Sequence, residues 1–150
     1  MSGDFFETLG VPAFVGRTIA PADDVVGGGP AGLVAVISHS FWQRRFGAAS
    51  DVIGSSLLVE GVPVTVVGVA PARFNGVQVG FVFDLLLPIR TNDLIRPTTP
   101  RDLHAAWLRI MLRLRPEQSM DAATAALQAA QPQIRSGSLP PNTPLSLIHI

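Results

Sequence analysis

The sequence predicts an α+β domain, in which short helices flank a mixed, mainly antiparallel sheet. Residues 56–60 and 63–69 are two strand-like runs separated only by residues 61–62, a spacing typical of a β-hairpin. Consecutive strands joined by so tight a turn pair antiparallel. The apolar, β-branched residues 33–37 predict a buried strand, and the alternation of apolar residues with arginines over 107–115 predicts a half-buried one.

Two short helices are predicted in the first third of the chain, over residues 2–9 and 38–46. Each is followed by a glycine, Gly10 or Gly47, which can adopt the left-handed conformation that closes many helices. We expect the helices to lie on one face of the sheet. The candidate N-terminal caps are Ser2 or Asp4 for the first helix and Ser38 or Ser40 for the second, where Ser40 and Gln43 have capping-box spacing.

The second half of the chain predicts two more strands and one helix. Residues 84–89 predict a short strand that Pro88 closes. Ser119 can cap an alanine-rich helix, which Pro132 should kink or stop, and the chain beyond residue 135 has the composition of a disordered segment. In the strand over 107–115, the residues expected to be buried are Leu108, Ile110, Leu112 and Leu114, and those expected to point outward are Arg109 and Arg113.

The composition excludes several classes of function. The formal net charge is +0, so no global field attracts nucleic acid. The chain has no cysteine, which excludes disulfides, thiolate nucleophiles and cysteine-ligated zinc. No run approaches the roughly 18 apolar residues of a membrane-spanning helix.

A glycine-rich run imitates the fingerprint of a dinucleotide-binding turn. Gly27, Gly29 and Gly32 spell G-x-G-x-x-G, but such a turn needs a strand before it and a helix after it. Here the residues that follow, 33–37, favour a strand and not a helix. The fingerprint also needs an acidic residue about 20 positions further on, and the only candidate, Asp51, has no strand leading into it. A surface loop is the better interpretation, with a flavin- or nicotinamide-binding oxidoreductase as the alternative.

Neighbouring polar residues at the start of the second helix could suggest nucleophilic catalysis. Ser38, His39 and Ser40 are consecutive, however, and a nucleophile needs a base placed opposite it in space. No G-x-S-x-G elbow surrounds either serine. We therefore interpret the serines as helix caps and Trp42 as part of the core.

Neither a metal site nor a nucleic-acid site is predicted. The three histidines, His39, His104 and His149, are far apart in the sequence and lack helical metal-ligand spacing. The pair Asp23-Asp24 is expected to be a solvated pair of acids in a loop. One face of the strand over 107–115 carries Arg109, Arg113 and Arg115, but Trp107 is the only aromatic residue beside them, so a solvated or interdomain face is favoured over base stacking.

Several phrases, in this order and spacing, resemble the MacB-like periplasmic core domain of ABC-transporter-type permeases, including the orphan permeases that share it. No phrase is specific alone, but together they cover residues 2–131. The matching phrases lie at residues 2–6, 9–11, 16–18, 37–38, 41–47, 52–54, 61–71, 74, 84–88 and 112–119.

The resemblance implies a non-catalytic extracytoplasmic domain that couples the motion of an ATPase to export or partner binding. It implies no catalytic residue, cofactor or metal. The implied partners are the permease's membrane helices, a cytoplasmic ATPase and a periplasmic adaptor or second copy, and the implied location is the periplasmic side of the bacterial inner membrane. Residues 2–131 would be part of the family's domain. Residues 132–150 would be a disordered or artefactual tail, because residues 145–150 do not resemble the family and suggest a truncated gene.

Overall fold

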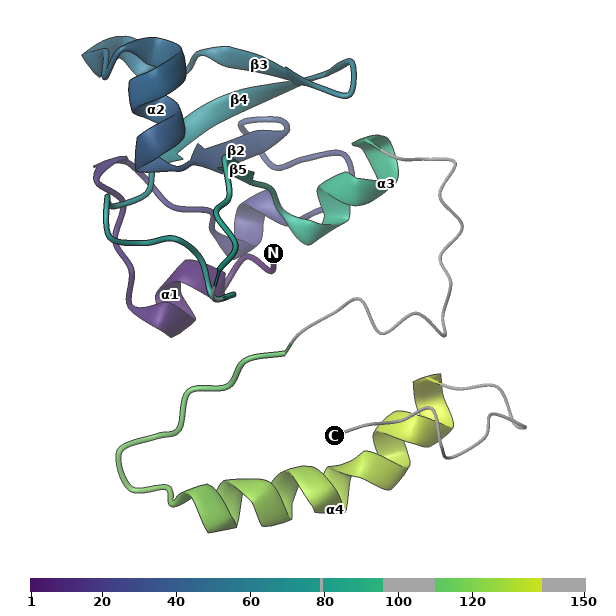
Figure 1. The fold of residues 1–150 in the computed structure, drawn as a ribbon. Coiled ribbons are helices and arrows are strands. Elements are labelled where there is room, and N and C mark those ends of the chain that lie inside the picture. Colours follow the sequence, from purple (N-terminus) through teal and green to yellow (C-terminus); the bar gives the residue numbers. More distant parts are fainter. Residues whose placement is uncertain (79, 96–109, 139–150) are drawn as a thin grey trace. The chain divides into compact units, whose positions relative to one another are not determined.

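The computed structural model describes residues 1–78, 80–95 and 110–138 (Figure 1). The chain divides into two units, Met1–Thr99 and Pro100–Ile150. The first unit contains the sheet with its short helices, and the second contains the long helix α4 (Met120–Ser138).

A five-stranded sheet forms the centre of the first unit, within the described residues. The strand order is β1-β4-β2-β5, and β3 also pairs with β4. Among the described strands only the β2–β4 pair is parallel, which confirms the predicted α+β class with a mixed, mainly antiparallel sheet. The strands are β1 (Val15–Gly16), β2 (Val34–Ile37), β3 (Ser56–Val59), β4 (Val62–Val69) and β5 (Leu85–Leu86).

The central strand β4 organises the sheet because it pairs along both of its edges. Its first half pairs with β3 and its last two residues pair with β1, while its other edge runs parallel to β2. All four residues of β2 are buried, as the apolar run at 33–37 predicted. Such uniform burial is typical of a strand covered on both faces.

The hairpin of β3 and β4 turns one residue earlier than predicted. Val59 pairs with Val62, so the two turn residues are Glu60 and Gly61 and not residues 61–62. Both have positive φ, 50° and 84°, as the favoured two-residue hairpin turn requires. Glycine adopts this conformation freely, whereas a β-branched valine does not.

The two predicted helices are present, and local residues explain their ends. Helix α1 (Phe5–Leu9) follows Asp4, whose side chain makes no capping bond, and ends at Gly10 with φ of 67°. Helix α2 (His39–Phe46) ends at Gly47 with φ of 58°. Its cap is Ser38, the earlier of the two candidates. The other helical segments of this unit are η1 (Pro21–Asp23), η2 (Ser50–Val52), η3 (Ile89–Thr91) and α3 (Asn92–Ile95).

The core lies on both faces of the sheet, so the prediction that the helices share one face is wrong. Val36 of β2 belongs to a buried cluster with Phe6 of α1. The next residue, Ile37, belongs to a second cluster with Trp42 of α2. Successive side chains of a strand point to opposite faces, so α1 and α2 cover opposite faces. The sequence pattern shows which residues are apolar but not which face each helix covers.

The prediction of a half-buried strand over 107–115 is wrong for the part that the structure describes. Residues 107–109, which include Leu108 and Arg109, lie outside the described residues. Residues 110–115 form neither strand nor helix, and Ile110 and Leu112 are 84% and 62% exposed. Alternation stabilises a strand only where a neighbouring strand supplies hydrogen bonds, and no described strand pairs with this segment.

Helix α4 begins where predicted but extends further. The Oγ of Ser119 accepts a hydrogen bond from the backbone N–H of Ala122 at 3.2 Å, as expected of a cap. The helix then continues past Pro132 to Ser138, so the proline does not stop it. Alanine has the highest helix propensity, which favours helix throughout the preceding segment. The proposed boundary between residues 131 and 132 stays a prediction. Among the described helices, none combines the length and apolar character needed to cross a membrane.

Candidate interaction site

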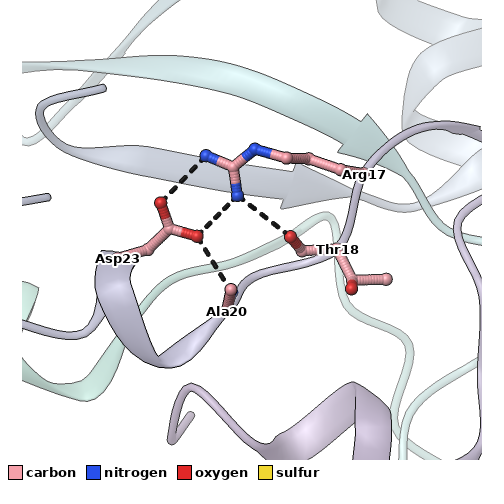
Figure 2. Close-up of polar contacts among 4 residues, drawn as sticks. All are labelled: Arg17, Thr18, Ala20 and Asp23. Atoms are coloured by element: carbon pink, nitrogen blue, oxygen red, sulfur yellow. Dashed lines mark hydrogen bonds and ion pairs between the residues drawn. The ribbon is translucent and has the colours of Figure 1, made fainter. Parts of the chain in front are cut away.

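An ion pair with a buried carboxylate closes the loop that follows β1 (Figure 2). The Nη1 and Nη2 atoms of Arg17 donate to the two carboxylate oxygens of Asp23 at 2.6 and 2.9 Å. The backbone N–H of Ala20 donates to the same carboxylate at 2.9 Å, and Arg17 also donates to the carbonyl of Thr18 at 3.1 Å. The Asp23 side chain is 4% exposed and that of Arg17 47% exposed. The pair therefore holds the loop in one conformation.

The same contacts explain how the two charged groups titrate. The hydrogen bonds from Arg17 lower the pKa of Asp23, with further help from the Ala20 N–H, although burial opposes this change. In return, the hydrogen bond to Asp23 raises the pKa of Arg17. Both changes favour the charged forms, so the pair stays ionised at neutral pH.

The neighbouring carboxylate, Asp24, connects three parts of the first unit. Its oxygens accept hydrogen bonds from the backbone N–H of Gly3 at 3.2 Å and of Arg90 at 3.0 Å. The expectation that Asp23-Asp24 is a merely solvated pair of acids is therefore wrong. Sequence reasoning missed these partners, because Gly3 and Arg90 lie far from Asp24 along the chain.

The glycine-rich run forms a loop and not a dinucleotide-binding turn. Gly27, Gly28 and Gly32 have φ of 87°, 90° and 72°. A single backbone bridge joins Gly29 to Gly32, and the chain then enters β2 at Val34. No helix starts at the position where a bound pyrophosphate would need its N-terminus. Nothing in this geometry supports the oxidoreductase alternative.

Of the two serines interpreted as helix caps, Ser38 caps α2 and Ser40 does not. The Oγ of Ser38 accepts a hydrogen bond from the N–H of Phe41 at 3.1 Å and lies 3.1 Å from the Oγ of Ser40. The ring of His39 instead packs edge-on against Phe14 and Trp42, with centroids 5.2 and 5.3 Å away. Trp42 is buried and its Nε1 donates to the carbonyl of Ala49, which confirms its place in the core.

The remaining candidates form no site among the described residues. His104, His149 and Arg109 lie outside the described residues, and Arg113 and Arg115 are exposed. Within the part of the chain that the structure describes, no group of three or more histidine, aspartate or glutamate residues lies close enough to hold a metal ion.

A cavity of about 330 Å³ lies beside the N-terminal end of α2. It is lined by residues 38–40 and Gln43 from the start of α2, and by Ala72, Phe74 and Asn75 from the segment after β4. The first group follows β2 and the second follows β4, so the cavity lies at the carboxyl ends of the parallel pair. Sequence reasoning did not find this cavity, because the pairing of β2 with β4 brings the two segments together.

These observations define an α+β domain whose charged groups hold its loops together. The family model of the MacB-like periplasmic core domain matches residues 1–130. The chain therefore belongs to this family and is an extracytoplasmic domain of an ABC-transporter permease. Neither the curated proteins nor the solved structures contained a significant match to the chain.

Proposed function

We propose that this domain performs no chemistry of its own and couples the motion of an ATPase to export or to the binding of a partner. The observation that carries the proposal is the family match over residues 1–130. Permeases of this family reside in the inner membrane and work with ATPase subunits. A domain on the far side of the membrane can receive the ATPase's motion only through the connecting protein.

The contacts within the first unit support a mechanical role. Arg17 and Asp23 hold the loop after β1, and Asp24 bonds to backbone groups near both ends of the unit. A further ion pair joins Arg44 of α2 to Asp84, just before β5, at 2.7 Å, but both side chains are more than half exposed and the pair adds little to the rigidity of the unit. The bonds of Asp24 connect segments that are far apart in the sequence, and a domain that transmits force must move as one body.

The test requires a complete permease that contains this segment, together with its ATPase. Residues 2–131 are replaced by a short Gly/Ser linker, and the protein is reconstituted in lipid vesicles. We expect membrane insertion and basal ATP hydrolysis to persist, because the membrane spans and the ATPase lie outside the deleted segment. ATP-dependent export or capture of a periplasmic partner should be lost.

A point variant provides the control for the deletion. Asp84→Ala removes only an exposed ion pair and should leave export unchanged. Export that survives the deletion would contradict the coupling role. Substrate turnover by the isolated chain would contradict the non-catalytic assignment. Chemical cross-linking of the reconstituted permease then tests whether the partner is a periplasmic adaptor or a second copy.

A further inference from the structure

The cavity beside α2 has a position that favours ligand binding. Strands β2 and β4 are parallel neighbours, so the segments that follow them leave the sheet at the same edge. In open sheets with parallel strands, ligands commonly bind just outside these carboxyl ends. The volume of about 330 Å³ lies within the range of roughly 300–1,000 Å³ for small-molecule sites.

The lining is rich in hydrogen-bonding groups. Among the described residues, no aspartate, glutamate, lysine or arginine lines the cavity, and His39 is its one titratable side chain. The carboxamides of Gln43, on α2, and Asn75, after β4, both line it; they are exposed to solvent, and no described residue forms a hydrogen bond with either side chain. A carboxamide both donates and accepts hydrogen bonds, as a hydroxyl does. Together the two amides can pair with several hydroxyl groups of one ligand.

An aromatic wall completes the cavity, and its position is fixed by the core. The ring of Phe74 packs against Phe5, Phe6 and Phe83, with centroid distances of 6.3, 5.8 and 5.9 Å. The ring therefore needs no reordering when a ligand binds, which lowers the entropic cost of binding. Its apolar surface suits the C–H face of a sugar ring.

We infer that this cavity binds a neutral, polyhydroxylated ligand, a single sugar unit. Gln43 and Asn75 bond to its hydroxyl groups, and Phe74 contacts the face of the ring. The Oγ of Ser40 is held by Ser38 at 3.1 Å and adds an oriented hydroxyl group to the lining. This binding site is independent of the proposed coupling role, and its test requires no ATPase or membrane.

The experiment titrates the 150-residue chain with glucose and follows the backbone and side-chain amide resonances by NMR. We expect saturable shifts of the Gln43 and Asn75 side-chain amides and of residues 38–40. The double variant Gln43→Ala/Asn75→Ala should weaken binding by about tenfold or more, because it removes the hydrogen bonds to the sugar. The control Gln78→Ala alters an exposed amide outside the cavity and should leave the affinity unchanged.

Three results would overturn the inference. The first is an absence of saturable shifts at the solubility limit of glucose. The second is binding that the double variant leaves unchanged while its spectrum shows a folded protein. The third is equal or tighter binding of cyclohexanol, which would identify the cavity as a simple apolar pocket.

Discussion

Two ion pairs among the described residues of the first unit allow a direct test of what holds its loops. Asp23→Ala and Asp84→Ala each remove a carboxylate whose oxygen lies within 2.6 or 2.7 Å of a guanidinium nitrogen. The distances are nearly equal, but the environments differ. The Asp23 side chain is 4% exposed, whereas both members of the Arg44–Asp84 pair are more than half exposed.

The expected costs follow from this difference in burial. Asp23→Ala removes the bonds from Arg17 and leaves the N–H of Ala20 without its acceptor. Losing a hydrogen bond to a charged group costs about 1.5–3 kcal/mol, but Arg17 is half-exposed and water replaces part of its loss. We therefore expect the free energy of unfolding to fall by about 2 kcal/mol. For Asp84→Ala, the usual value for an exposed pair predicts about 0.5 kcal/mol or less.

Urea denaturation of the 150-residue chain measures both costs. In a Trp107→Phe background, the fluorescence of the buried Trp42 reports on the first unit. Asp23→Asn should cost less than Asp23→Ala, because the amide oxygen can still accept the N–H of Ala20. If Asp23→Ala and Asp84→Ala destabilise the chain equally, the argument from burial is refuted.

Three further perturbations test the same structure. Because the pKa of Asp23 is lowered on folding, the stability that its ionised carboxylate contributes is complete above the unfolded pKa of about 4 and is lost as pH falls through the folded pKa. The difference in the free energy of unfolding between wild type and Asp23→Asn, measured in urea, should therefore narrow below about pH 4. A difference that stays constant with pH would argue against this linkage. Val36→Asp should unfold the first unit because Val36 is fully buried, whereas Leu58→Asp should be tolerated because the Leu58 side chain is 76% exposed. Far-UV circular dichroism distinguishes an unfolded variant from a folded one, and equal spectra for the two variants would contradict the prediction. Gly68→Ala would press a Cβ against the carbonyl oxygen of Arg17 and should lower the free energy of unfolding by about 1–3 kcal/mol in the same urea assay. An unchanged midpoint of urea unfolding would show that β1 and β4 are less closely packed than described.

A corrected expectation concerns the segment after the first unit. The alternation over 107–115 predicted that Ile110→Asp would unfold the domain. Ile110 is 84% exposed, so we now expect this substitution to change the free energy of unfolding by less than about 0.5 kcal/mol. A loss of fold in this variant, seen by circular dichroism, would restore the original prediction that Ile110 is buried.

The sequence by itself determined the features whose causes lie within a few residues. Gly10 and Gly47 end helices because glycine adopts a positive φ without steric cost. The start of α2 follows from the hydroxyl of Ser38, which reaches the N–H three residues ahead. The hairpin was also predicted, although its turn was misplaced by one residue. The order of these local phrases was enough to indicate the family.

Only the tertiary structure decided which distant segments meet. It placed α1 and α2 on opposite faces of the sheet and joined Asp24 to Arg90, which is 66 residues away in the sequence. It also brought Gln43 and Asn75 to one cavity, through the parallel pairing of β2 with β4. Periodicity and propensity describe what a segment can form, but they do not identify its partner. Partner choice depends on the packing of the whole unit, and for this reason residues 110–115 alternate like a strand and yet form none.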